Sequence, residues 1–345
     1  MKKIVKQVLG IDVAQKELVV CLGRMFDDWT SELYAHKTFS NSAKGFADCV
    51  KWVGKFSVLT VPIRYVMEAT GVYHESLAYY LEAQKQEVSI ILPNKISNYA
   101  RTLDAKTVTD KTASEAIALF GLERKLENWV KPSELFKKLR QLTREREQLI
   151  AARTVAKNQL HAELAEAAPL QNSVNRIKKQ IAFFTRHEQE IKADIIELIK
   201  TAPVELKESI KQICSISGVG LLTAVTVLGE TNGFELIRNK RQLTSYAGLD
   251  VKEKQSGTSV KGKARISKRG NKYLRKAMHM PALAAIRHDE RYKAIFARLV
   301  AKHGIKMKAA VAVQRKLLEL IYIIYKTKND YNKEYIQNNK QVIAL

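Results

Sequence analysis

The sequence is poor in residues that build thiolate metal sites and disulfide frameworks. Its 345 residues include only three cysteines, Cys21, Cys49 and Cys214, which lie far apart and lack the spacing of metal ligands. The seven histidines are scattered as well, so we expect no zinc site. We interpret the cysteines as reduced core residues, which is typical of a cytoplasmic protein.

Long apolar runs are also missing. No stretch approaches the roughly 18–20 apolar residues that a transmembrane helix needs. The beginning, Met-Lys-Lys-Ile-Val-Lys, is basic but has neither the long apolar segment nor the small-residue cleavage site of a signal peptide. We therefore expect a cytoplasmic bacterial protein without a membrane-spanning segment, and we expect no membrane partner.

Acidic residues are scarce relative to basic ones. There are 35 Asp and Glu against 59 Lys and Arg, which gives a formal net charge of +24. Such an excess attracts polyanions whatever their sequence, and nucleic acid is the obvious one. A membrane surface is the alternative partner. Hydrophobic residues make up 46% of the chain, which is ample for the cores of two domains.

Residues 1–128 have the pattern of an α/β domain. Two β-rich segments around the polar turn Ala14–Glu17 predict a hairpin. Further strands are expected where short apolar runs end at Glu68 and at Pro93. The predicted strands are 5–13, 18–23, 63–67 and 88–92, and the predicted helices are 42–53, 73–83 and 111–122, the last capped near Thr109 or Asp110.

Residues 129–205 differ in character, with apolar stripes at helical spacing and dense charges between them. Pro169 separates the two stripes. We interpret this segment as two long helices that form either an antiparallel hairpin or an intermolecular coiled coil, and we expect it to mediate oligomerisation. The alternative is a solvated helical spacer.

Residues 206–330 are expected to form a mainly helical domain, followed by a polar tail over 331–345. The run Ser-Gly-Val-Gly resembles the turn of a helix-hairpin-helix. Gly218 and Gly220 would let the backbone approach a phosphate, next to the N-terminal amides of the following helix. A glycine turn between two packed helices is the alternative interpretation.

Three carboxylates lie where a metal site could form. Asp12 closes the first strand in Leu-Gly-Ile-Asp-Val, Glu68 closes a later one in Met-Glu-Ala-Thr-Gly, and Asp110 opens a helix in Thr-Asp-Lys. A carboxylate that ends an apolar strand is costly to bury unless something compensates its charge. Mg²⁺ takes oxygen ligands and can assist phosphoryl transfer, so we predict that these acids hold Mg²⁺. Each acid could instead be a plain strand-end or cap residue.

The second candidate site is a basic segment. Residues 251–276 contain ten basic residues and one acid. We expect a flexible loop that grips phosphates, then a helix from about residue 272. Ser256, between Gln255 and Gly257, could attack a phosphodiester, although a serine in such a loop is more often a hydrogen-bond donor, as we expect of Ser267. The predicted nucleic-acid contacts are Gly218, Gly220, Lys252, Lys254, Lys261, Lys263, Arg265, Lys268, Arg269, Lys272 and Arg275.

These motifs occur in a familiar order. Gly-Ile-Asp-Val, Met-Glu-Ala-Thr-Gly, Thr-Asp-Lys, Ser-Gly-Val-Gly, Tyr-Ala-Gly-Leu, Gln-Ser-Gly and Ser-Lys-Arg-Gly-Asn follow one another across residues 5–325. In this order the chain resembles the DEDD transposases of the bacterial insertion-sequence 110 family, whose relatives include Piv-type DNA invertases. Each motif is modest alone, and the shared order makes the resemblance specific.

The resemblance implies a RuvC-like, ribonuclease-H-type domain that binds Mg²⁺ through an Asp-Glu-Asp-Asp set. It also implies that Ser256 attacks the DNA backbone and forms a covalent phosphoserine link. Members of such a family act as homo-oligomers, dimers or tetramers, and use a structured RNA that pairs with donor and target DNA. Sequence choice would then lie in base pairing, and the protein would mainly hold backbones.

The chain departs from the family pattern at one position. The third and fourth acids should be spaced Asp-x-x-Asp, but Asp110 is followed by Ala113. Asp104 lies too early, and Glu115 lies about 140° around the helix from Asp110. The chain is therefore expected to cut poorly, as a natural outlier or as a protein whose aspartate was replaced by design.

Three functions compete on this evidence. The first is a metal-dependent transposase or recombinase that uses Ser256. The second is a site-specific invertase or junction-resolving nuclease that uses metal-activated water. The third is a nucleic-acid-binding protein without catalytic activity, whose acids are structural.

Overall fold

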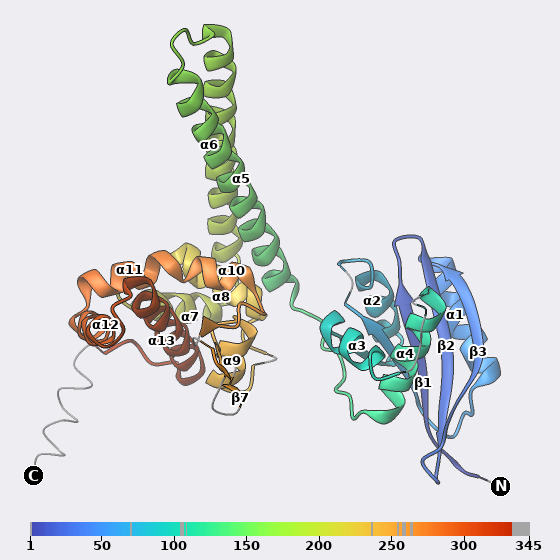
Figure 1. Cartoon of the computed structure of the whole chain (residues 1–345). Helices are drawn as coiled ribbons and strands as arrows, with labels where there is room; N and C mark the ends of the chain where they lie inside the picture. The colour runs from blue at the N-terminus through green and yellow to red at the C-terminus, as the bar shows by residue number, and fades with distance from the viewer. Residues whose placement is uncertain are drawn as a thin grey trace, which may run out of the picture. The chain divides into compact units, whose positions relative to one another are not determined.

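A computed structural model of the chain describes residues 2–69, 71–103, 107, 109–235, 237–253, 255–256, 260–262 and 265–332 (Figure 1). The chain divides into two compact units, Met1–Lys131 and Pro132–Leu345. Of the helical segment predicted at 129–205, residues 132–205 belong to the second unit and the first three residues to the first unit. Within the described ranges, no helix is long and apolar enough to cross a membrane.

The N-terminal unit is built on a five-stranded mixed sheet in the order β3-β2-β1-β4-β5. Strands β1, β2 and β3 form an antiparallel meander, which includes the predicted hairpin, while β4 and β5 run parallel to β1. This order places β1 at the centre of the sheet. The strands are β1 (Ile4–Val13), β2 (Glu17–Phe26), β3 (Ser31–Ser40), β4 (Ile63–Glu68) and β5 (Glu87–Ile91).

Helices cover both faces of this sheet, and alternate residues of β1 serve the two cores. Leu9 and Ile11 pack in a cluster with residues of α1 (Ala43–Phe56) and α2 (Glu75–Ala83). Val8 packs on the other face with residues of α3 (Pro93–Ala100) and α4 (Asp110–Glu123). Because side chains alternate along a strand, Asp12 shares the face of Val8 and α4.

Two elements of this unit, strand β3 and helix α3, were not predicted from the sequence. Strand β3 lies at the edge of the sheet, and Phe39 is its one buried residue, so the strand lacks the apolar alternation that signals a half-buried strand. Pro93 ends β5 as expected but also begins α3, because a proline fits the first turn of a helix, where its missing N–H is not needed.

The C-terminal unit begins with two long helices, α5 (Glu134–Leu164) and α6 (Gln171–Lys200), which pack side by side (Figure 1). Part of each apolar stripe is buried in the unit, for example Leu139, Ile191 and Ile195. The stripes are therefore covered in part within the chain itself. A role of these helices in contacts between subunits stays a prediction.

One buried carboxylate fastens α6 to α5. Glu188 accepts Arg146 at 2.9 Å and Arg153 at 2.6 Å from α5, and Lys192 at 2.9 Å from its own helix. Burial by itself would raise the pKa of Glu188, but the hydrogen bonds and charges of Lys192 and Arg146 outweigh it and lower this pKa to about 2. The ionised form is thus the one that stabilises the helix pair.

Replacing Glu188 by glutamine is expected to lower the stability of the C-terminal unit in a pH-dependent way. A depressed carboxyl pKa contributes stability above the pKa of the unfolded chain and loses it as the pH falls through the folded value. The gap between wild type and Glu188→Gln should therefore be largest above about pH 5 and close as the pH approaches 2. Urea unfolding followed by circular dichroism across this range measures it. If the difference in unfolding free energy between the two proteins did not change with pH, the ionised Glu188 carboxylate would not be what stabilises the helix pair.

The rest of the C-terminal unit is a helical core that carries a small β-ribbon. The predicted turn at Ser-Gly-Val-Gly joins α7 and α8, and the predicted helix near residue 272 is α10. The helices are α7 (Val204–Cys214), α8 (Leu221–Thr231), α9 (Lys240–Tyr246), α10 (Lys272–Ala277), α11 (His279–His288), α12 (Glu290–His303) and α13 (Lys306–Thr327). The expected polar tail beyond residue 332 lies outside the described residues.

The described residues of the basic segment include short paired strands, where we predicted a flexible loop. Its ends pair as β6 (Val251–Lys252) with β9 (Arg265–Ile266), and further out β7 (Gln255–Ser256) pairs with β8 (Val260–Lys261), all antiparallel. The short strands escaped prediction because lysine, glycine and serine, which dominate here, are not strand formers.

Candidate functional site

The first candidate site is an acidic edge of the N-terminal sheet. Ile11 of β1 lies beside Met67 of β4 in parallel register, so the next residues, Asp12 and Glu68, end neighbouring strands at the same edge. Val8 and Val66 contribute to the core on the α4 face. Asp12 follows Val8 by four residues, and Glu68 follows Val66 by two. Because side chains alternate along a strand, both acids belong to the α4 face.

Helix α4 runs over this face with its N-terminus toward the acids. Gly121, late in the helix, lies against Val8, whereas Ser114 and Ala118 lie over Gly10. A Cβ on Gly10 would stand 2.4 Å from the Ser114 carbonyl oxygen, so glycine is needed here for the helix to approach. Asp110, one turn before Ser114, therefore opens the helix near Asp12.

Electrostatics connects the three carboxylates. Burial raises the pKa of the half-buried Asp12 carboxyl, and the negative charges of Asp110 and then Glu68 raise it further, while a hydrogen bond from the Val13 backbone acts in the opposite direction. Asp12 thus lies close to two further negative charges, which is an environment suited to a cation. Thr109 caps α4 by accepting from the Thr112 backbone N–H at 3.2 Å, which fixes where the helix starts.

The three side chains are chemically suited to Mg²⁺, because each would supply a carboxylate oxygen as a ligand. Across the ranges that the structure covers, however, no group of three His, Cys, Asp or Glu side chains could hold an ion as it stands. Coordination of Mg²⁺ by Asp12, Glu68 and Asp110 thus stays a prediction. The structure supports a common edge and face for Asp12 and Glu68, and an effect of the Asp110 and Glu68 charges on Asp12.

Position 113 lies on the same side of α4 as these acids. Ala113 is half-buried, and Ile117, one turn later, is fully buried against the sheet. Glu115 instead pairs with His36 of β3 at 2.9 Å, so it is engaged elsewhere. Asp104, the other acid considered, lies outside the described residues. No described acid therefore substitutes for an aspartate at position 113.

Asp12→Asn is expected to stabilise the metal-free protein at neutral pH. A carboxyl with a raised folded-state pKa costs stability once the pH exceeds its unfolded pKa, and asparagine removes that cost. Mg²⁺ should raise the melting temperature of the wild type but not of Asp12→Asn. Tryptophan fluorescence reads this unit selectively, because Trp29, Trp52 and Trp129 all lie in it. Equal Mg²⁺ shifts in both proteins would rule out Asp12 as a ligand.

The second candidate site, in the C-terminal unit, is the β-ribbon. Ser256 is in strand β7, where its backbone lies opposite Val260 of β8. A serine at this place is carried by a hairpin rather than by a free loop. Its use as a nucleophile stays a prediction.

Cations surround the base of this ribbon. Lys252, Arg265, Lys268, Arg269 and Lys272 are exposed, so they are available to phosphates. The side chain of Lys261 is not described, and Lys254 and Lys263 lie outside the described residues.

Two residues of the predicted contact set, Arg275 and Gly218, already have structural roles, and so does Ser267. The Arg275 guanidinium donates to the carbonyl oxygens of Ala247 at 2.8 Å and Gly270 at 3.1 Å. The Ser267 hydroxyl hydrogen-bonds the Asp250 carboxylate at 2.5 Å. Gly218 has φ +88°, and an added Cβ would stand 2.6 Å from the Pro281 carbonyl oxygen of α11. Gly220, which precedes α8, has nothing within 4 Å of such a Cβ and leaves that helix start open.

A buried polar cluster around Glu230 was not predicted from the sequence. Glu230 of α8, whose side chain is 1% exposed, accepts a bidentate pair from Arg144 at 2.7 and 2.8 Å. Asn271, which caps α10, donates to the same carboxylate at 2.6 Å. Glu230 thereby joins α5 and α8 to the start of α10. A glutamate inside the apolar run Leu-Leu-Thr-Ala-Val-Thr-Val-Leu-Gly-Glu was the signal available in the sequence.

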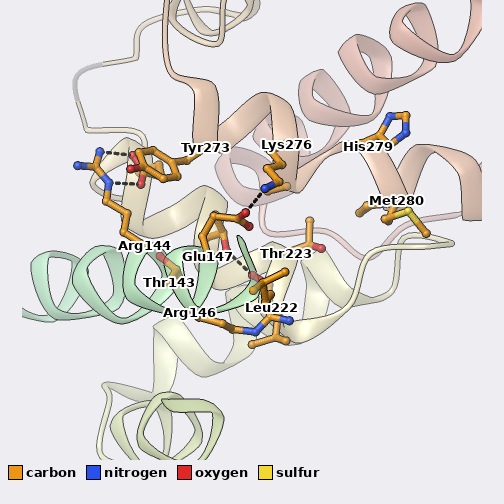
Figure 2. A pocket seen from close by; sticks show the side chains of 15 residues that line it. Thr143, Arg144, Arg146, Glu147, Leu222, Thr223, Tyr273, Lys276, His279 and Met280 are labelled. Carbon is orange, nitrogen blue, oxygen red and sulfur yellow. Dashed lines mark hydrogen bonds and ion pairs between the residues drawn. The ribbon is translucent and has the colours of Figure 1, made fainter. Parts of the chain in front are cut away.

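A pocket of about 440 Å³ adjoins this cluster (Figure 2). Arg144 and Tyr273 line one side of it, and the Arg144 guanidinium lies 4.6 Å from the Tyr273 ring centroid. Lys276 of α10 pairs with Glu147 of α5 across it. The charges that line the pocket are thus largely paired with one another, which makes it part of the support of α10.

Comparisons with known proteins agree with the order of these motifs. A family model described as a transposase, of the DEDD type of IS110, matches residues 9–169. A second model, described as the transposase of the IS116/IS110/IS902 family, matches residues 210–297. The two models together span more than half of the chain and include all four predicted catalytic residues.

Whole-length relatives point the same way. The chain is 28% identical over 333 residues to the pilin gene-inverting protein of Moraxella lacunata, covering 95% of this chain and 98% of the relative. It is 24% identical to the transposase for insertion sequence element IS1111A of Coxiella burnetii, covering 94% of this chain and 91% of that relative. Among solved structures, T. thermophilus RuvC in complex with a Holliday junction covers 36% of this chain and 99% of that one, at 10% identity and a TM-score of 0.28, which does not establish a shared fold. By its two family matches and these relatives, the chain belongs to the IS116/IS110/IS902 family of transposases.

Proposed function

We propose that the protein is a DNA recombinase of a mobile insertion sequence, which cleaves and rejoins DNA strands with Ser256 as nucleophile and Mg²⁺ as cofactor. The observation that carries the proposal is the acidic edge, where Asp12, Glu68 and the start of α4 share one face of the sheet. Family membership supplies the reaction class. A RuvC-like, ribonuclease-H-type fold of this unit is part of the proposal.

In the proposed reaction the Ser256 oxygen attacks a backbone phosphorus and loses its proton. The bond from that phosphorus to one deoxyribose oxygen breaks, and the leaving oxygen takes up a proton. The phosphoserine link conserves the energy of the phosphodiester, so a second DNA hydroxyl can reverse the step and rejoin strands. Bound Mg²⁺ would stabilise the charge that develops on the phosphate oxygens. Lys268 and Arg269, exposed beside the ribbon, would add electrostatic stabilisation.

The partners we propose are donor and target DNA, a structured RNA from the element's non-coding DNA, and further copies of this chain. The net charge of +24 suits a protein that holds nucleic-acid backbones without reading many bases. Helices α5 and α6 are the proposed contact between copies, because Phe183 and Ile196 of α6 remain about half exposed. We also propose that Ala113 leaves this chain impaired in cleavage.

The test is a denaturing gel of labelled duplex carrying the DNA that flanks the coding sequence, incubated with protein, Mg²⁺ and transcripts of the flanking non-coding DNA. The Ala113→Asp protein should give a covalent protein–DNA band, and adding Ser256→Ala should abolish it. Ser267→Ala is the matched control, because Ser267 is a second serine of the basic segment and is bonded to Asp250. That variant should keep the band.

The remaining outcomes of this gel identify the competing functions. Cleavage without a covalent band would favour an invertase or junction-resolving nuclease that uses metal-activated water. No cleavage, even by the Ala113→Asp protein, would favour a nucleic-acid-binding protein without catalytic activity.

A further inference from the structure

A groove of about 420 Å³ lies at the base of the ribbon, against the N-terminal part of α13. Three separate parts of the chain build it, from residues 249–251, 265–268 and 305–315. Its apolar lining includes Val251, Ile266 and Val311, together with Ile305 and Met307. Val251, Ile305 and Met307 are 55%, 57% and 59% exposed, which is unusual for large apolar side chains gathered at one place.

Every charged residue that lines this groove is a cation. They are Arg265, Lys268, Lys308 and Arg315. Arg315 also bonds Glu319 at 2.9 Å, whereas within the described ranges the other three have no ion-pair partner. An apolar floor with an all-cationic rim is complementary to a ligand that combines an apolar face with phosphates, and nucleotides have this combination.

The groove also lies close to the proposed nucleophile along the chain. Val251 precedes Ser256 by five residues, which span at most about 18 Å of extended backbone. Consecutive phosphates of one strand are several ångströms apart, so a strand whose phosphate meets Ser256 can bring a nucleotide a few steps away to the groove.

We propose that this groove binds the base of one nucleotide that is turned out of its stack, with the flanking phosphates held by Lys268, Arg265 and Lys308. The proposal rests on the proposed function, since it concerns the same DNA or RNA strand near Ser256. An unstacked base can pack against apolar side chains, and the apolar surface buried in this contact offsets part of the free energy lost on unstacking. Cations at the rim hold the backbone on either side.

The test measures binding with EDTA present, so that cleavage plays no part. Fluorescence anisotropy compares a short labelled oligothymidylate with an abasic strand of equal length. The wild type should bind the strand with bases about tenfold more tightly. The double variant Ile305→Ser/Met307→Ser should lose most of this preference while its affinity for the abasic strand stays the same. Both side chains are more than half exposed, and serine suits the helix-capping position 305, so folding is not at risk.

Two further variants separate the contributions. Val155→Ser on α5, whose side chain is 56% exposed, is the matched control and should keep the preference. Lys308→Ala should weaken binding of both strands by the same factor and make its salt dependence shallower.

Other outcomes would overturn the proposal. Equal wild-type affinity for the two strands would mean that the groove takes no base, while the proposed function would stand. No binding of either strand would instead contradict the proposed function. If the double variant keeps the preference but lowers the oligomeric mass by light scattering, the groove is an interface between copies of the chain.

Discussion

Ala113→Asp is expected to raise Mg²⁺-dependent strand cleavage by two orders of magnitude or more. Position 113 lies one helical turn before the buried Ile117 and half-buried on the side of α4 that faces the sheet. An aspartate there adds a carboxylate beside Asp110, and altering even the outer support of a metal site changes affinity or activity by about 10–100-fold. A direct ligand should matter more, because Mg²⁺ needs near-ideal oxygen geometry.

DNA affinity should barely change in this variant, since the site contributes chemistry rather than backbone contacts. Ala113→Asn is the control, because asparagine has the size of aspartate without its charge. It should leave cleavage near the level of the unaltered chain. Single-turnover cleavage with saturating Mg²⁺ measures all three proteins. Equal rates for the unaltered chain and for Ala113→Asp would mean that three acids suffice and that position 113 is an ordinary helix residue.

Arg144→Ala is expected to destabilise the C-terminal unit by about 2–3 kcal/mol. It leaves the buried Glu230 carboxylate with Asn271 as its remaining described side-chain partner. Removing one partner of a fully buried ion pair usually costs more stability than this. Arg144 is 40% exposed, however, so water screens part of its attraction to Glu230. Circular dichroism during urea unfolding measures the change, and the tryptophan signal of the other unit should stay in place.

The matched control for this variant is Lys293→Ala. Lys293 pairs with Glu290 at 3.1 Å on the surface, and the two side chains are 59% and 87% exposed. Removing such a pair should cost well under 1 kcal/mol. An equal loss in Arg144→Ala and Lys293→Ala would show that Glu230 does not depend on its buried partner.

The sequence by itself determined the family, the positions of the candidate acids and serine, and most elements of the N-terminal unit. Strands β1, β2, β4 and β5 were predictable because each contains a short apolar run typical of a buried strand, and helix α4 because Thr109 and Asp110 signal its start. The edge strand β3 was not, since with Phe39 as its one buried residue it has no such period. The family resemblance rested on the order of the motifs along the whole sequence, and this order could be recognised without the structure.

The tertiary structure decided which distant residues meet. The register of β1 with β4 brings Asp12 and Glu68 to one edge, and the close approach of α4 at Gly10 sets Asp110 beside them. Likewise Glu230 meets Arg144 and Asn271, 86 and 41 residues away, only because α8 packs between α5 and α10. Local patterns report which face of an element is apolar. The faces that pack together are those that bury the most apolar surface while pairing every buried charge. This condition involves residues from the whole chain, so a local pattern does not reveal it.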